Sequence, residues 1–320
     1  MEFIGCGALN WDSFFEVKDL SKISYKGKPF LPGREISLSP DEFASLFSFL
    51  KKRGEFKVSL PGGSAANTIY ALSKWGFKTG FIGAVGEDEA GEKILEALKA
   101  NGVDTSFVKK GGKTSQALIV IDEKKDRFIA VCPGTAEQLL RSEYFLDFSF
   151  ECGLLHFSSF ASNTGFEFQK SLLKMQIPKI SFDPGEIYTA KGKEKISSFL
   201  KKTRYLFITQ EELELLGESP VHLLEQGIKV VFLKQGKKGA SFYQKGLMGR
   251  VSAISCRRIK DNTGAGDYFN AGVLAGLKSE LSVDRAVELG CRVAALSLAD
   301  YGSLSLPSKS LFQKLLTLVK

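Results

Sequence analysis

The segment Asp261-Asn262-Thr263-Gly264-Ala265-Gly266-Asp267 decides the fold class of this chain of 320 residues. It places three small residues between two carboxylates, at the start of a stretch, residues 266–277, that predicts a helix. Backbone N–H groups at a helix N-terminus lack partners and bind anions, and small residues let a ligand approach them closely. Asp267 in the first turn suits a group that removes a proton from a hydroxyl while the amides stabilise a phosphate. A glycine-rich turn whose acidic residue favours the helix N-terminus would have the same pattern.

Two further segments carry polar residues where strands meet turns or helices. Gly62 and Gly63 precede a predicted helix, residues 65–75, and Asn67 within it offers both a donor and an acceptor to hydroxyl groups. Asn10 and Asp12 follow the first predicted strand, residues 2–6, and ligands of α/β sheets bind at the carboxyl ends of strands. Asp12 can accept hydrogen bonds from two adjacent hydroxyls. Taken alone, each segment is also compatible with a helix cap or a turn.

The second half of the chain alternates between short apolar runs and helical stretches. This alternation indicates βαβ units, a parallel sheet and an α/β body. The predicted strands cover residues 79–85, 153–157, 179–182, 205–208 and 229–233. The predicted helices cover residues 89–101, 165–174, 193–201, 211–216, 266–277, 283–298 and 309–319.

The early strands do not fit this parallel alternation. Residues 14–17 predict a strand, and residues 117–121 and 127–131 predict a hairpin around a charged turn. We expect them to form a small antiparallel sheet beside the body. Residues 25–33, with two glycines and two prolines, predict a loop. Ser39 as N-cap and Pro40 at the first position predict a helix over residues 40–53.

Composition and charge exclude several classes of protein. With 43% hydrophobic and 25% charged residues, the chain is neither a disordered tail nor a disulfide miniprotein. The net charge of +8 suits an anionic ligand, but without a clustered basic stripe it does not favour nucleic acid. Five cysteines without a C-x-x-C pair and only two histidines argue against disulfides and a zinc site. We find no signal peptide and no apolar run long enough for a transmembrane helix, and we expect a cytoplasmic protein.

Together, the three polar segments resemble the signatures of the ribokinase-like (pfkB) carbohydrate kinases, over nearly the full length of the chain. Residues 62–67 match the family's GG-x-x-x-N signature, and residues 76–88 continue it. Residues 261–267 match the signature D-T-x-G-A-G-D, and residues 7–12 resemble the early G-x-x-N-x-D. The G-x-G-x-x-G of a Rossmann dehydrogenase is absent from the first turn. The resemblance implies one kinase domain, residues 1–320, with a three-layer α/β/α body around a mostly parallel sheet. It also implies a small antiparallel β lid formed by residues 12–61 and 114–133.

The resemblance also implies a role for individual residues. Asp267 corresponds to the general base that deprotonates the accepting hydroxyl. The residues that correspond to the anion hole are Gly264, Ala265 and Gly266. The residues implied to bind substrate hydroxyls are Asn10, Asp12, Gly62, Gly63 and Asn67. Those implied to bind ATP are Thr209, Glu212, Lys234, Gly236, Gly239 and Cys291. A monovalent cation such as K⁺ would be bound by Asp261 and Thr263, and Mg²⁺, which arrives with ATP, by Glu212 through water.

The chain departs from the family pattern at several of these positions. Asn262 stands where Thr, Ser, Pro or Val is usual, and we expect it to alter cation binding more than the base. Thr209 replaces the asparagine of the family's N-x-x-E motif, which puts the metal network there in question. Lys234 replaces a small hydroxyl residue, so it is either a cation near the triphosphate or a solvent-exposed lysine.

Three other departures concern the acceptor end. Ser64 and the sequence Gly134-Thr135-Ala136 differ from the ribokinase pattern and argue against a simple transfer of ribose specificity. The additional helix, residues 40–53, should lie near the sugar end and alter the lid.

These features lead to one main hypothesis and three alternatives. The main one is ATP-dependent phosphorylation of a hydroxyl group on a small sugar, and the nearest alternative is a nucleoside kinase of the same family. A catalytically silent binder is disfavoured by the intact Asp267, and a nucleic-acid binder by the scattered charge. The expected partners are a sugar or nucleoside, with no nucleic acid and no membrane, and the expected state is a monomer or a homodimer through the lid.

Phenylalanine is unusually common, with 26 residues against 8 tyrosines and 2 tryptophans. Most of these rings, such as Phe81 and Phe207, should fill the core. Those near Asp12 and in the segment assigned to the lid could instead shield the acceptor or stack on a base; they are Trp11, Phe14, Phe15, Tyr25 and Phe30.

Overall fold

The alternating half of the chain builds a nine-stranded sheet in the computed structural model, which describes residues 1–141, 143, 152–175, 177, 179–256 and 259–320. The strand order is β16-β15-β14-β13-β12-β11-β1-β7-β8. All neighbours are parallel except the two pairs at one edge, β14 with β15 and β15 with β16. The bounds are β1 Phe3–Cys6, β7 Thr79–Val85, β8 Val108–Lys110, β11 Leu154–Ser158, β12 Ile180–Asp183, β13 Tyr205–Thr209, β14 Val230–Lys234, β15 Ala240–Gln244 and β16 Leu247–Val251.

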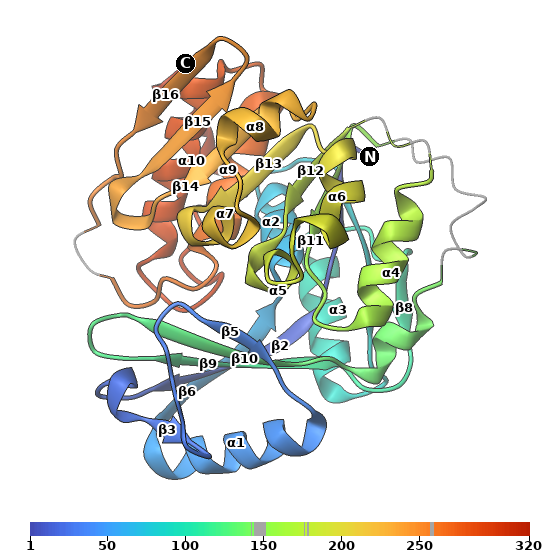
Figure 1. Ribbon diagram of the computed structural model, residues 1–320, viewed down its shortest axis with the longest axis vertical. Helices are drawn as coiled ribbons and strands as arrows, with labels where there is room; N and C mark the ends of the chain where they lie inside the picture. Colours follow the sequence, from blue (N-terminus) through green and yellow to red (C-terminus); the bar gives the residue numbers. More distant parts are fainter. Residues whose placement is uncertain (142, 144–151, 176, 178, 257–258) are drawn as a thin grey trace.

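Helices cover both faces of this sheet (Figure 1), which confirms the three-layer α/β/α body. The pleat sends alternate residues to opposite cores: Phe81 and Val85 of β7 join one core, and Ile82 and Ala84 join the other. The first core is completed by α2 Ser64–Lys74, α3 Glu89–Ala100, α9 Ala265–Lys278, α10 Val283–Ser297 and α11 Lys309–Val319. The second is completed by α4 Asn163–Leu172, α5 Gly185–Thr189, α6 Lys193–Lys202, α7 Gln210–Leu216 and α8 Pro220–Glu225.

A second, five-stranded sheet lies beside the body, and we call it the small sheet. Its order is β5-β10-β9-β2-β6, and its bounds are β2 Asn10–Glu16, β5 Glu35–Ser37, β6 Glu55–Gly62, β9 Ser115–Ile121 and β10 Arg127–Cys132. The predicted hairpin is present as β9 and β10. The sheet is mixed, because β2 pairs with β9 and β5 with β10 in parallel. A two-stranded ribbon, β3 Ser24–Tyr25 and β4 Lys28–Pro29, lies within the segment predicted as a loop.

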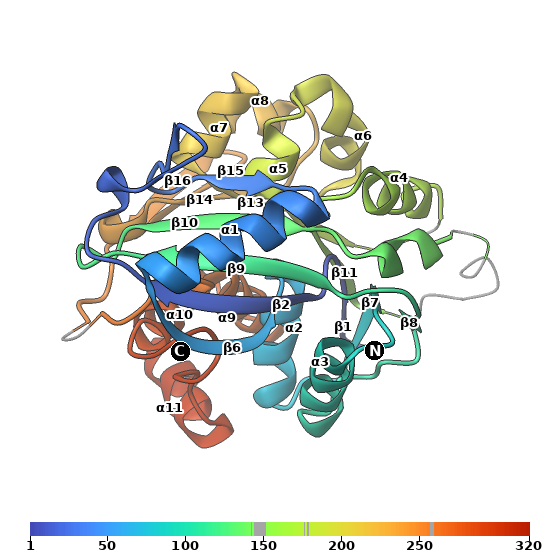
Figure 2. The ribbon, with the colours of Figure 1, turned by 90° about the horizontal axis from the view of Figure 1, so that it is seen from below.

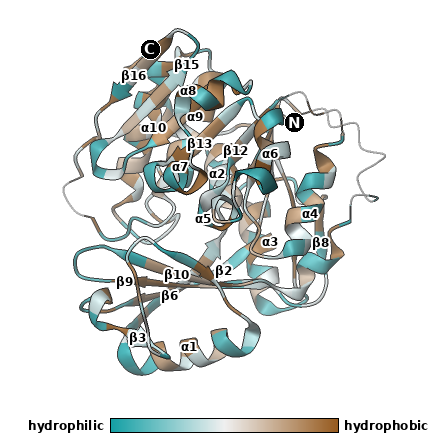
Figure 3. Ribbon diagram, viewed as in Figure 1, coloured by the Kyte–Doolittle hydropathy of each residue, from teal (hydrophilic) through white to brown (hydrophobic). Residues whose placement is uncertain are grey.

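The two faces of the small sheet have different partners. On the inner face, Phe14 and Ile119 pack toward the body, where Tyr301 joins their cluster. On the outer face, Phe15 and Leu118 pack under α1 Pro40–Arg53, a helix that begins at the predicted N-cap Ser39 with a capping box. Figure 2 shows α1 lying across the sheet, and Figure 3 shows hydrophobic residues in the middle of the strands. The additional helix therefore covers the side of the small sheet that faces away from the body.

The hypothesis that the early aromatic rings stack on a substrate is wrong for most of them. Phe15, Tyr25 and Phe30 belong to the outer cluster, where Phe30 stacks on Phe128 at a centroid distance of 4.4 Å. Phe14 faces inward but is only 1% exposed and contacts Tyr301. Trp11 packs against the first core of the body. The abundant phenylalanines thus serve packing in both the body and the small sheet.

Several elements were absent from the sequence predictions: strands β5, β6 and β8, the edge hairpin β15–β16, and the short helices α5 and α8. His156 lies in the core, and burial lowers its pKa to about 4, so the ring is neutral. None of the helices in the described part of the chain is long and apolar enough to cross a membrane.

Candidate active site

Three segments that are distant in the sequence meet where the small sheet joins the body. Asn67, in the first turn of α2, donates from Nδ2 to Oδ2 of Asp267, in the first turn of α9, across 2.9 Å. The hydroxyl of Thr68 donates to the backbone oxygen of the same aspartate. Asn10 pairs with Gly62, so the start of β2 lies beside the loop that enters α2. The structure therefore brings together the three segments that the sequence analysis selected.

The two glycines before α2 allow this close packing. A Cβ on Gly62 would stand 1.9 Å from Oδ2 of Asp12, so the carboxylate lies directly over the glycine. A Cβ on Gly63 would stand 2.1 Å from the carbonyl oxygen of Ala8, and its φ of +106° is one that side chains rarely adopt. Asp12 is thus held against backbone that only glycine can provide.

The carboxyl of Asp12 faces the site with an unused acceptor. Asp12 is 8% exposed, and its Oδ1 finds no hydrogen-bond partner among the residues that the structure describes; the same holds for Oδ1 of Asn10. Burial raises the pKa of Asp12 well above its usual range, and the charges of Glu35, Asp267 and Asp261 add to the shift. A buried acceptor without a partner costs free energy, which a donating ligand would recover. Asp12 and Asn10 can therefore receive hydroxyl groups.

Asp267 has the properties of a general base. Burial raises its pKa to about 7, which exceeds the opposing effect of the hydrogen bond from Asn67 and of the nearby Lys234 and Arg127. A base with a pKa near neutrality accepts a proton most effectively at neutral pH. Asp267 lies in the first turn of α9, three residues after the αL N-cap Gly264, and the first N–H groups of a helix have no partner within it. A carboxylate whose pKa is raised and the N-terminus of α9 thus lie at one place.

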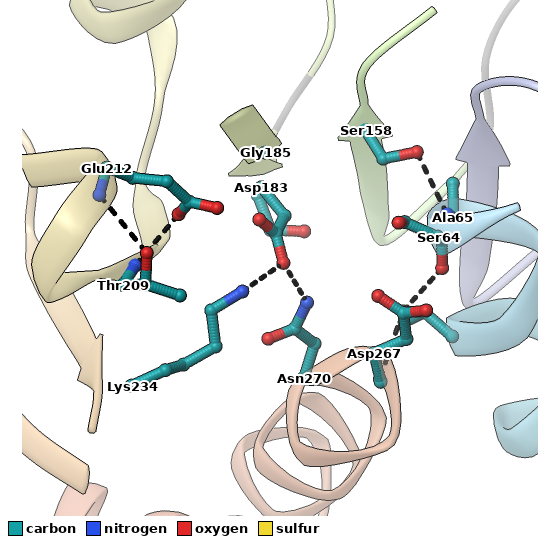
Figure 4. A network of polar contacts seen from close by, with 12 residues as sticks. Ser64, Ala65, Ser158, Asp183, Gly185, Thr209, Glu212, Lys234, Asp267 and Asn270 are labelled. Carbon is teal, nitrogen blue, oxygen red and sulfur yellow. Dashed lines mark hydrogen bonds and ion pairs between the residues drawn. The ribbon is translucent and has the colours of Figure 1, made fainter. Parts of the chain in front are cut away.

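A second polar cluster lies at the ends of β12, β13 and β14 (Figure 4). Lys234 forms an ion pair with Asp183, with 2.6 Å between Nζ and Oδ2, and Asn270 donates from Nδ2 to the same oxygen across 2.6 Å. Thr209 and Glu212 form a capping box at the start of α7. Burial raises the pKa of Glu212, and Asp183 adds to this, whereas Lys234 opposes it. Lys234 is therefore a partly enclosed cation, not a solvent-exposed lysine.

The remaining residues implied to bind nucleotide follow β14 or lie on α10. Gly236 and Gly239 enclose a short 3-10 turn and have φ values of +53° and +93°. A Cβ on Gly239 would stand 2.1 Å from the carbonyl oxygen of Val251, so the turn needs glycine there. Cys291 is 6% exposed on α10 within the first core, and burial raises its pKa to about 11. The thiol of Cys291 therefore stays protonated and packs as an apolar group.

The loop before α9 is tied to the small sheet. Asp261 is buried and accepts from the backbone N–H groups of Thr263 and Gly302, across 2.7 and 3.0 Å. Arg127, the first residue of β10, donates to the backbone oxygen of Asn262 across 2.7 Å. The Asn262 amide donates in turn to the backbone oxygen of Lys125 across 2.9 Å. The residue that departs from the family pattern thus connects the β9–β10 turn to the loop that carries Asp267.

Sequence reasoning did not select Asp183, Asn270 or Glu35. Asp183 ends a parallel strand, and that position was a signal for a ligand-binding residue. Glu35 lies on β5, and burial raises its pKa to about 7; Arg127 lowers it, while Glu186 and Asp267 raise it further. Nothing in the local sequence places Glu35 near the site, because β5 reaches it only through pairing with β10.

Comparisons with known proteins agree with this geometry. Residues 50–309 match the model of the pfkB family carbohydrate kinases. Over 240 residues the chain is 32% identical to a protein of Archaeoglobus fulgidus described as an uncharacterized sugar kinase, covering 72% of this chain and 96% of that protein. It is 26% identical over 283 residues to a fructokinase of Solanum tuberosum, covering 82% of this chain and 87% of that one. The solved nucleoside kinase of Methanocaldococcus jannaschii, an archaeal member of the ribokinase family, has a TM-score of 0.77 and 22% identity, covering 99% of this chain and 98% of that one.

The fold and the site thus define a ribokinase-like kinase. The chain belongs to the pfkB family of carbohydrate kinases, and it is an ATP-dependent enzyme that transfers a phosphoryl group to an alcohol.

Proposed function

We propose that this enzyme transfers the γ-phosphoryl group of ATP to a hydroxyl of a small sugar, with Asp267 as the general base. The observation that carries the proposal is the position of the Asp267 carboxylate, held by Asn67 at the N-terminus of α9. Asp267 takes the proton of the accepting hydroxyl, whose oxygen forms a bond to the γ-phosphorus. The bond from phosphorus to the β,γ-bridging oxygen breaks, and ADP leaves with the electron pair. The amides of Gly264, Ala265 and Gly266 stabilise the charge of the transferred group.

The acceptor would lie between the small sheet and α2. The unpartnered oxygens of Asn10 and Asp12 support a role in accepting hydrogen bonds from hydroxyls, and Asn67 and the backbone of Gly62 and Gly63 lie beside them. Asn10, Asp12 and Phe14 alternate along β2, so they share the inner face of the small sheet. In this proposal the small sheet, with the segments 12–61 and 114–133, closes over the acceptor as a lid.

The nucleotide would lie over the ends of β13 and β14. Lys234, Thr209 and Glu212 would face the phosphates, the backbone of Gly236 and Gly239 would line the nucleotide, and Cys291 would contact its apolar part. In this proposal Mg²⁺ arrives with ATP. Glu212 is the carboxylate that would hold it through water, and Asp261 with Thr263 would hold K⁺. Bound Mg²⁺ would neutralise phosphate charge.

The structure supports a sugar over a nucleoside. On the inner face of the small sheet, Phe14 is buried against Tyr301, beside aliphatic residues such as Ala117 and Ile119. The other rings proposed for base stacking lie in the outer cluster or, in the case of Trp11, pack against the body. The fructokinase relative agrees with a sugar acceptor. The nucleoside kinase neighbour keeps a nucleoside acceptor as the second candidate.

The test is a screen of ATP consumption over sugars and nucleosides with Mg²⁺ and K⁺ present. We expect turnover with one or more sugars, and none with Asp267→Asn under the same conditions. Turnover confined to nucleosides would replace the sugar by the second candidate. Turnover by the Asp267→Asn variant at more than a tenth of the wild-type rate would refute the assignment of the base.

A further inference from the structure

The ammonium group of Lys234 lies beside the backbone assigned to the anion hole. An added Cβ on Gly266 would stand 3.6 Å from Nζ and 3.7 Å from Cδ of Lys234, so the lysine runs past the start of α9. Its side chain is 13% exposed, and that of its partner Asp183 is 5% exposed. A flexible lysine on the surface would be free to turn into solvent; this one is held in place.

Two elements hold the lysine through one carboxylate. Asp183, at the end of β12, receives Lys234 from β14, and Asn270 from α9 donates to the same Oδ2 (Figure 4). Asn270 is fully buried and lies one turn beyond Asp267 on the same helix. The helix that carries the base therefore also fixes the partner of the lysine.

The charges around Lys234 keep it protonated. Burial lowers its pKa, but the carboxylates of Asp183 and Glu212 more than offset this, so the pKa lies above its usual value. An enclosed ion pair contributes little to stability, because each charge loses its hydration. Stability alone is therefore a weak reason for this arrangement.

Thr209, which pairs with Lys234 on the neighbouring strand β13, gives a reason for a fixed cation at this place. Thr209 stands where the family carries the asparagine of N-x-x-E, and its Oγ1 accepts from the backbone N–H of Glu212 in the helix cap. The side chain of Thr209 is thus engaged in capping. Lys234 is the side chain beside this position that presents a positive charge toward Gly266.

We propose that Lys234 is a catalytic residue that contacts the transferred phosphoryl group and stabilises its charge in the transition state, with Asp183 and Asn270 as positioning residues. This inference rests on the proposed function and leaves its reactants and products unchanged. If Lys234 only helped to bind ATP, its contact with the phosphates would be equally strong before and during the transfer. The proposed role requires a stronger contact during the transfer.

The test compares Lys234→Met with wild type, and with Lys245→Met as a control in the exposed turn between β15 and β16. We expect Lys234→Met to lower kcat by about 10²–10³-fold with little change in KM for the acceptor. Asp183→Asn and Asn270→Ala should lower kcat less. The same Lys234→Met substitution should weaken binding of ADP with aluminium fluoride, which mimics the transferred group, far more than binding of ADP alone.

A structural role would weaken both forms of binding equally, so equal losses would overturn the proposal. In a Lys234→Ala variant that retains the wild-type melting temperature, added ethylammonium should restore part of kcat. If Lys234→Met does not fold, Lys234→Arg and this rescue decide the question. Wild type that phosphorylates no alcohol contradicts the proposed function. An active wild type whose Lys234→Met variant keeps kcat within threefold contradicts only the role of Lys234.

Discussion

The amide of Asn67 donates to the carboxylate of Asp267 across 2.9 Å, although the two residues are 200 positions apart in the chain. This bond joins the first turns of α2 and α9, the two helix starts that the sequence signatures mark. It favours the charged form of Asp267, against the effect of burial. The pKa of Asp267, the proposed base, therefore depends on residues of both helices.

Replacing the base should separate binding from chemistry. In Asp267→Asn, the amide is nearly the same size but accepts no proton, so we expect kcat to fall by about 10²–10⁴-fold. Binding of ATP, measured by calorimetry, should stay within a fewfold of wild type. A variant that keeps more than a tenth of the wild-type rate would remove Asp267 from the role of base.

The rate should depend on pH through the same residue. Because the pKa of Asp267 is about 7 and the base acts when deprotonated, kcat/KM for the acceptor should rise with pH and level off above about 7. In Asn67→Ala the carboxylate loses the bond that stabilises its charge, so the pKa should rise and the acid limb should move to higher pH. A limb that stays in place, or moves to lower pH, would show that another group controls the profile.

The two glycines before α2 should respond differently to alanine. In Gly62→Ala the new methyl meets the side chain of Asp12, so we expect a more than tenfold increase in acceptor KM with a nearly unchanged melting temperature. In Gly63→Ala the methyl meets the backbone of Ala8 at a positive φ, so stability should fall by more than about 1 kcal/mol. Gly27→Ala, at a φ of +76° with nothing within 4 Å, isolates the cost of backbone strain. A Gly62→Ala variant whose melting temperature falls while its acceptor KM stays unchanged would contradict the placement of Asp12.

The sequence was most informative where function depends on neighbouring residues. The loop before α9 and the glycines before α2 were predicted because the residues that create each helix N-terminus are contiguous. Asp183 and Glu35 were missed because their partners come from other strands. The faces of Phe14 and Phe15 could not be assigned, since adjacent residues of a strand point to opposite faces and only the packing of the small sheet between α1 and the body decides which ring faces which partner. Strand β6 lies at an edge and contains Pro61 and charged residues, which weaken its pattern.

Asn262 should control how firmly the small sheet is attached. Asn262→Ala removes the bond from its amide to the backbone oxygen of Lys125 and the weaker 3.3 Å contact with Arg127, while the backbone bond to Arg127 can persist. We expect faster proteolysis in the β9–β10 turn and a severalfold higher acceptor KM, with kcat less affected. Asn163→Ala, on the exposed start of α4, is the matched control. Unchanged proteolysis would mean that the other contacts of the small sheet suffice.

The outer face of the small sheet is already covered, which predicts a monomer. Phe43, Leu46 and Leu50 of α1 fill the outer cluster and are between 0% and 8% exposed, so a second chain cannot pack against this face without displacing the helix. We expect sedimentation at the mass of one chain, 35.1 kDa, at micromolar concentration. Leu46→Ala should lower the free energy of unfolding by about 2–5 kcal/mol, because it leaves a cavity under the helix.

The matched control is Ser45→Ala, at an exposed position on the same helix, which should change stability by less than about 0.5 kcal/mol. Leu46→Asp should disrupt the packing of α1 on the small sheet more strongly. The apolar outer face of the strands would then be exposed, and the chains should associate increasingly as the protein concentration rises. A wild-type dimer that persists on dilution would show that another surface, such as the open edge of β6, pairs between chains. That result would favour the homodimer over the monomer, and the pairing would then involve the sheet that we propose closes over the acceptor.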